Sequence, residues 1–210
     1  YYPIDPKLAP TPYNFANSSG VAAGFSFEEA VTRGVYEAIE RDAFMLTWIN
    51  RRSMPRIQID TLPEKEQLRI GRMEEHGYKI HIVNITVDLA PVILVIGVHN
   101  TKKPALILGA ASNFDLLVAI SKALSEVEYQ LYWTWRHPDD VHTLDDQKEV
   151  RDVLDHMALY ASQKNLSKAE FLWKGPEIPY SETSSSSSVN EFDRLCGSLE
   201  ATGKELVAAD

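Results

Sequence analysis

The stretch Tyr78–Ala110, YKIHIVNITVDLAPVILVIGVHNTKKPALILGA, decides the fold class. Tyr78–Val87 alternates apolar with polar residues, Pro91–Val98 is rich in β-branched residues, and Ala105–Ala110 is short and apolar. These patterns are typical of three successive strands. Because a parallel crossover needs a dozen or more residues, the short connections predict antiparallel neighbours.

Helical patterns surround this stretch on both sides. Ser26–Glu29 has the sequence of a capping box, in which a Ser hydroxyl accepts from an early free amide and a Glu three residues on reaches back. It predicts a helix to about Asn50. Thr61–Glu64 has the same capping-box sequence and predicts a second helix, which ends at Gly77. Further elements are predicted as a strand at 56–59, a helix capped at 112–115 that reaches about Trp135, and helices near 148–163 and 189–203.

We therefore predict an α+β fold, an antiparallel-rich sheet packed against long helices, in a single domain of 210 residues. Four prolines make residues 1–16 an expected extended arm, and five consecutive serines make 176–188 an expected mobile loop. We expect both ends of the sequence to be boundaries of a fragment of a larger domain.

Composition excludes several classes of protein. The net charge of −9 gives no long-range attraction for nucleic acid or anionic lipid. The longest apolar run, Ala90–Val98, is far short of the roughly 20 residues of a membrane helix. A lone cysteine, Cys196, cannot form an internal disulfide, so a reducing compartment, the cytoplasm, is expected.

The two long helices carry the strongest candidates for a functional site. Glu37, Glu40 and Arg41 share one helical face, and Glu126 lies one turn before Gln130 on the second helix. Carboxylates without a Cys/His set suit a hard cation such as Mg2+, which takes few protein ligands and fills its shell with water and phosphate. We predict that Glu37, Glu40 and Glu126 converge on one site, within about 10 Å. An ordinary i,i+4 ion pair between Glu37 and Arg41 is the alternative.

A small-residue loop, Asn17–Gly24, leads into the first helix and contains Ser18 and Ser19. Backbone amides at such a place favour anions, including phosphate. The loop matches neither the P-loop nor the dinucleotide fingerprint, so a simple turn is the alternative.

The order and spacing of these segments resemble the YcaO family. The resemblance is carried by four segments, SSGVAAG (18–24), EEA (28–30), EAIERDA (37–43) and ALSEVEYQ (123–130). Within the family, DHMALY (155–160) followed by EFL (170–172) is similar to the branch that makes azoline heterocycles in ribosomally made peptides.

The resemblance implies an ATP- and Mg2+-dependent cyclodehydratase. Such an enzyme phosphorylates a peptide amide oxygen after a Cys, Ser or Thr side chain has attacked that amide, so that phosphate leaves in place of water. By position, Glu40 and Arg41 are the implied catalytic residues, and Glu37, Glu40 and Glu126 the implied metal ligands. The implied nucleotide-binding residues are Ser18, Ser19, Glu37, Glu40, Arg41, Glu126 and Gln130.

The implied partners are a precursor peptide and a protein or fused domain that binds the leader of that peptide. A homodimer is possible. No nucleic acid or membrane partner is expected. Gly34 stands where the Ser-x-x-Glu-x-x-Glu-Arg motif of the family has Ser, so one hydroxyl contact is absent or comes from another residue. A degenerate or fragmentary scaffold module is therefore one alternative function. Another is a YcaO enzyme that acts on a different amide, in thioamide or amidine formation or in modification of a ribosomal protein.

Overall fold

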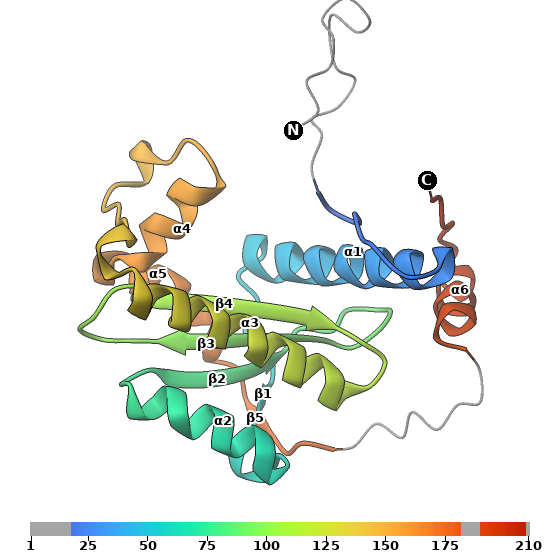
Figure 1. Ribbon diagram of the computed structural model, residues 1–210, viewed down its shortest axis with the longest axis horizontal. Coiled ribbons are helices and arrows are strands. Elements are labelled where there is room, and N and C mark those ends of the chain that lie inside the picture. The colour runs from blue at the N-terminus through green and yellow to red at the C-terminus, as the bar shows by residue number, and fades with distance from the viewer. Residues whose placement is uncertain (1–17, 182–189, 209–210) are drawn as a thin grey trace, which may run out of the picture.

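The computed structural model of the chain describes residues 18–181 and 190–208 (Figure 1). The described residues form helices around one five-stranded mixed sheet, in the order β4-β3-β2-β1-β5. The α+β fold with an antiparallel-rich sheet is therefore confirmed: every pair is antiparallel except β1–β5. The strands are β1 (Arg56–Ile57), β2 (Lys79–Asn84), β3 (Val92–Val98), β4 (Leu106–Ser112) and β5 (Glu177–Ile178).

Helices cover both faces of the sheet, which makes three layers (Figure 1). One core lies between the sheet and the pair α2 and α3. A second core lies on the opposite face, under α1, α6 and the segment from α4 through α5. The helices are α1 (Phe27–Ile49), α2 (Glu64–Glu75), α3 (Leu116–Arg136), α4 (Val153–Ala161), α5 (Leu166–Ala169) and α6 (Glu191–Ala201).

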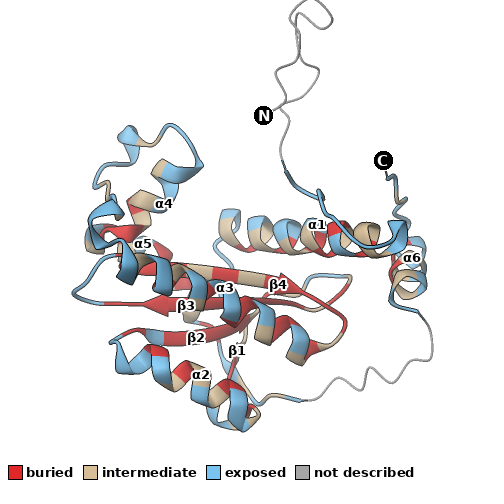
Figure 2. Cartoon of the chain, viewed as in Figure 1, coloured by how far each residue is buried: buried red, intermediate tan, exposed pale blue. Residues whose placement is uncertain are grey.

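Strand β3, between β4 and β2, is buried along its whole length (Figure 2). Ile93 and Val95 face the α2–α3 core, whereas Val92, Leu94 and Ile96 face the α1 core. Because successive side chains point to opposite faces, a strand with both faces covered is a continuous apolar run. β4 lies at the edge of the sheet, so one side of this strand has no neighbouring strand.

Two of the three predicted caps differ from expectation. Ser26 caps α1 as predicted, with its hydroxyl accepting from the amide of Glu29. The helix α3 is capped by Asp115, which accepts from the amides of Leu117 and Val118, and Ser112 remains in β4. Thr61 lies in a short 3-10 turn and accepts from the Tyr180 amide, so α2 starts after Pro63 without a side-chain cap.

The prediction of a loop over 176–188 is wrong at its start, because Glu177–Ile178 form β5, which pairs in parallel with β1. Residues 182–189 and the expected arm 1–16 lie outside the described residues. The predicted helix near 148–163 is interrupted: a 3-10 turn at Gln147–Glu149 precedes α4.

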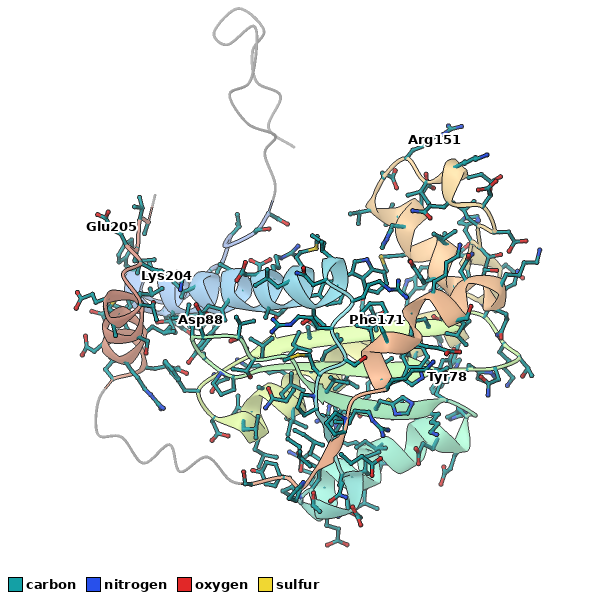
Figure 3. The ribbon with its side chains drawn as sticks, turned by 180° about the vertical axis from the view of Figure 1, so that it is seen from behind. Tyr78, Asp88, Arg151, Phe171, Lys204 and Glu205 are labelled. Atoms are coloured by element: carbon teal, nitrogen blue, oxygen red, sulfur yellow. The ribbon has the colours of Figure 1, made fainter. Side chains whose placement is uncertain are left out.

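Beyond α6, Lys204 forms an ion pair with Asp88 of the β2–β3 loop at 2.6 Å, which ties the end of the described chain to the sheet (Figure 3). In the part of the chain that the structure describes, no helix has the length and hydropathy to cross a bilayer.

His81 should make the fold sensitive to acid. It is 7% exposed in β2 and stacks on Trp173 at 6.0 Å. Burial, and then Lys79 and Arg56, lower the pKa of His81 from 6.5 to about 4. The unfolded chain thus binds the extra proton between those values, so the contribution of His81 to stability is complete above pH 6.5 and is lost as pH falls through about 4. We expect this loss to reach about 3 kcal/mol.

The measurement is urea unfolding at a series of pH values for the wild type and His81→Phe, which keeps a ring against Trp173 and cannot titrate. The variant should lose less stability than the wild type between pH 7 and 4. His142→Gln, a change at an exposed histidine, serves as the control and should follow the wild type. Equal pH dependence in His81→Phe and the wild type would show that His81 titrates normally.

Candidate functional site

A pocket of about 360 Å³ lies at the open edge of β4, where α1 and α3 reach past the sheet from opposite faces. It brings together charged side chains from both helices and small residues from the end of the strand. Its lining residues are Arg33, Tyr36, Glu37, Glu40, Ala110, Ala111, Ser112, Lys122, Ser125 and Glu126.

On the α1 side, Glu37 ties the loop at residues 18–24, here called the Gly20 loop, to the helix. Its Oε2 accepts from the Gly20 amide at 2.9 Å, and its Oε1 accepts from Arg41 Nε at 2.8 Å. The i,i+4 ion pair that the sequence left as an alternative is therefore present. Each carboxylate oxygen has two lone pairs, so these bonds leave Glu37 able to bind a cation as well.

On the α3 side, Glu126 and Gln130 lie along the edge of β4. Glu126 Oε2 accepts from the Ala110 amide at 3.0 Å, and Gln130 Nε2 donates to the Leu108 carbonyl at 2.6 Å. An edge strand presents unpaired backbone groups, and here two side chains one helical turn apart satisfy them. Close approach of the helix depends on Gly109, since a Cβ there would lie 2.5 Å from the Ala123 carbonyl oxygen.

Two carboxyl groups in the pocket, Glu40 and Glu126, have raised pKa values. Burial, with the nearby Glu126 second, raises the pKa of Glu40 to about 8, while Arg41 opposes the shift. Burial also raises the pKa of Glu126, against the lowering effect of the Ala110 amide and Arg41. Low-dielectric surroundings and like charges both disfavour the anion, and a cation between the two groups would relieve both effects.

The donor set fits Mg2+ bound together with phosphate. Among residues 18–181 and 190–208, no group of three or more His, Cys, Asp or Glu side chains is close enough to hold a metal ion by itself. Mg2+ is, however, commonly held by one or two carboxylates, with water and phosphate oxygens completing its octahedron. Glu40 and Glu126, the two carboxyl groups with raised pKa, are the residues best suited to this role.

The structure brings some of the predicted site residues together and places others nearby. Glu37, Glu40 and Glu126 line one pocket, and Arg41 lies close enough to affect the pKa of two of them. Gln130 does not line the pocket, and its amide binds β4 instead. Ser18 and Ser19 also lie outside the lining, although their loop reaches Glu37 through the Gly20 amide.

Sequence reasoning missed Tyr36, Ser112 and Lys122 as lining residues. Tyr36 donates to Glu191 Oε1 at 2.5 Å, and Asn113 Nδ2 donates to the same oxygen at 3.1 Å. Through Tyr36, this cluster connects α6 to the lining of the pocket. The only available sequence signal was that Tyr36 precedes Glu37 and that Ser112 begins the predicted cap of the second long helix, two residues after a predicted strand.

A wider surface hollow of about 620 Å³ lies elsewhere, lined by Lys168 and by residues 145–148. Its Asp145 is already paired with Lys164 and accepts from Ser162. None of the predicted site residues lies there. We therefore place the candidate site in the smaller pocket.

A family model described as YcaO cyclodehydratase, ATP- and Mg2+-binding, matches residues 1–210. The chain belongs to the YcaO family. The resemblance seen in the four sequence segments is thereby confirmed. A curated relative, an uncharacterized protein of Methanothermobacter thermautotrophicus, is 29% identical over 133 residues, which is 60% of this YcaO chain and 34% of the relative.

Solved structures share the fold of this YcaO chain. A heterocyclase in complex with substrate and cofactor has a TM-score of 0.74 and 23% identity, over 97% of this chain and 26% of its own. YcaO from Methanopyrus kandleri, bound with AMPPCP and Mg2+, has a TM-score of 0.69 and 15% identity, over 93% of this chain and 50% of its own. The E. coli microcin synthetase McbBCD complex with pro-MccB17 has a TM-score of 0.65 and 16% identity, over 94% and 49%. This chain thus spans a quarter to a half of those structures.

Gly34, which replaces the Ser of the family motif, has a structural role in this chain. A Cβ on Gly34 would lie 2.5 Å from the Gly20 carbonyl oxygen, so the Gly20 loop lies directly on the helix at this point. The same loop donates the Gly20 amide to Glu37. The missing side chain therefore allows the loop to contact α1.

We expect Gly34→Ser to displace the Gly20 loop without unfolding the domain. The loop is exposed and can move, so the free energy of unfolding should fall by only about 1 kcal/mol. Hydrogen exchange should show a much less protected Gly20 amide, because its bond to Glu37 is lost. Gly197→Ser is the control, since no atom lies within 4 Å of a Cβ at that helical position. Unchanged protection of the Gly20 amide in Gly34→Ser would contradict this account.

Proposed function

We propose that this chain carries the Mg2+–ATP site of an ATP-dependent cyclodehydratase that forms azolines in a ribosomally made precursor peptide. The observation that carries the proposal is the pocket at the β4 edge, where Glu37 and Glu40 of α1 face Glu126 of α3. The family description and the ligands named for the structural neighbours support the choice of ATP and Mg2+.

In the proposed reaction, a Cys, Ser or Thr side chain loses its proton as it attacks the preceding amide carbon, and the amide oxygen then takes the γ-phosphoryl group of ATP, with ADP as the leaving group. The carbon–oxygen bond breaks as phosphate leaves, and the amide nitrogen loses its proton as the C=N bond forms. The products are the azoline, ADP and phosphate, and the two protons pass to phosphate and solvent. Bound Mg2+ would offset negative charge on the phosphate oxygens.

The residues of this chain have separate parts in that scheme. Glu40 and Glu126 would hold the ion, with Glu37 as a further ligand that also binds Arg41. Arg41 offsets charge that develops on the transferred phosphoryl group. The Gly20 loop, with Ser18 and Ser19, supplies backbone amides and hydroxyls to phosphate oxygens. Gln130 holds α3 against β4 through its bond to the Leu108 carbonyl, and thereby positions the site.

The proposed partners are the precursor peptide and a protein or domain that binds its leader. A heterocyclase with substrate and the microcin synthetase complex with pro-MccB17 are similar in fold to this chain, which supports a peptide substrate. A homodimer and a cytoplasmic location remain predictions.

The deciding experiment incubates a candidate precursor with the full-length protein, ATP and Mg2+, and follows the peptide mass. Each azoline removes one water, and we expect this loss to depend on both ATP and Mg2+. A thioamide would instead exchange oxygen for sulfur, which the mass distinguishes. A scaffold module would leave the peptide unchanged and would show no Mg2+ requirement in nucleotide titration; that pair of results would overturn the proposal.

A further inference from the structure

Ser112, the last residue of β4, has a buried hydroxyl that no group in the described residues satisfies. Its side chain is 3% exposed, and its Oγ has no hydrogen-bond partner there. In the neighbouring Asn113, by contrast, Nδ2 donates to Glu191 and Oδ1 accepts from the Asp115 amide. Ser112 also lines the pocket of the three carboxylates.

The register of the sheet explains where this hydroxyl faces. Ser112 pairs with Val92, whose side chain belongs to the core on the α1 face. Residues opposite each other in a ladder point to the same face, so Ser112 faces α1, which supplies Glu37 and Glu40. Glu126 reaches the same space around the edge of β4.

A buried hydroxyl without a partner is unfavourable, since its lost water is not replaced. Such groups in native proteins commonly mark a place where a ligand or a water completes the bonding. The pocket restricts the ligand: its three carboxylates disfavour a bare anion, and a bare cation could take a lone pair of the hydroxyl oxygen but would leave the hydroxyl proton without an acceptor. A phosphate oxygen that arrives with Mg2+ satisfies both conditions.

We propose that Ser112 is a nucleotide-binding residue whose hydroxyl donates a hydrogen bond to a phosphate oxygen of Mg2+–ATP. The inference rests on the proposed function of the pocket and adds a contact from the sheet to those from the two helices.

The chain offers a matched control in Thr47 of α1. Its Oγ1 is likewise without a partner in the described residues, and the residue is 0% exposed. Thr47 does not line the pocket. Ser112→Ala and Thr47→Val both remove an unsatisfied buried hydroxyl, but only the first removes one from the proposed site.

The test is isothermal titration of the wild type and both variants with Mg2+–ATP and with Mg2+–tripolyphosphate, together with thermal melts of the free proteins. We expect both variants to melt no lower than the wild type. Ser112→Ala should bind both ligands about tenfold more weakly, as expected for loss of a hydrogen bond to a charged group. Thr47→Val should bind like the wild type.

If the wild type binds Mg2+–ATP and Ser112→Ala binds it with equal affinity, this inference is overturned and the proposed function stands. An equal loss in Thr47→Val would also overturn it, because the effect would then be general to buried hydroxyls. A wild type that binds neither ligand would overturn the proposed function itself, and the role of Ser112 with it.

Discussion

Glu126→Gln should lower the affinity for Mg2+–ATP by about a hundredfold, the scale of removing one member of a buried charge contact. The folded protein should be no less stable at pH 8. A Gln side-chain oxygen can still accept from the Ala110 amide, and the repulsion that contributes to the raised pKa of Glu40 disappears. Thermal melts with and without Mg2+–ATP give both quantities, since a ligand that binds only the native state raises Tm.

Glu128→Gln provides a matched control on the same helix. Glu128 pairs with Arg69 through both carboxylate oxygens, at 2.9 and 2.7 Å, and does not line the pocket. This variant should lose about 1 kcal/mol of stability and keep its Mg2+–ATP shift in Tm. The two Glu→Gln changes thus have opposite expected outcomes. An equal ligand-induced shift in Glu126→Gln and the wild type would remove Glu126 from the site.

Helices, strands and caps that are determined by neighbouring residues in the chain could be predicted from the sequence. The strands at Tyr78–Ala110 and the cap at Ser26 depend on patterns within a few residues, and both are found where expected. The short strand β5 depends on parallel pairing with β1 about 120 residues earlier, so no local pattern reveals it. The cap of α3 shows a subtler limit: Ser112 and Asp115 both fit the motif, and the length of β4 decides between them.

The same distinction applies to the candidate site. Helical spacing placed Glu37, Glu40 and Arg41 on one face, and Glu126 lines the same pocket as the two glutamates of α1. The bond of Gln130 to β4 and the burial of Ser112 could not be predicted from the sequence, because they come from the β4 edge and from packing under α1. Sequence periodicity shows which residues share a helix face, whereas the partner of that face depends on the assembled layers.

Gly109→Ala should separate α3 from β4 and damage both stability and nucleotide binding. The new Cβ would lie 2.5 Å from the Ala123 carbonyl oxygen and 2.9 Å from Glu126 Cβ. The backbone contact cannot be relieved by a rotamer change, so the helix or the edge strand has to move. We expect a loss of about 2–3 kcal/mol of unfolding free energy in urea. The Glu126 and Gln130 bonds to β4 should weaken together, which would also lower the Mg2+–ATP shift in Tm.

Gly71→Ala is the control for this change. Gly71 lies within α2, and no atom lies within 4 Å of a Cβ there, so the variant should gain about 0.5–1 kcal/mol from helix propensity. Its response to Mg2+–ATP should match the wild type, because α2 does not line the pocket. A Gly109→Ala protein with normal stability and a normal ligand shift would show that α3 can retreat without loss. The close fit of α3 against the β4 edge would then not be what positions Glu126 opposite Glu40.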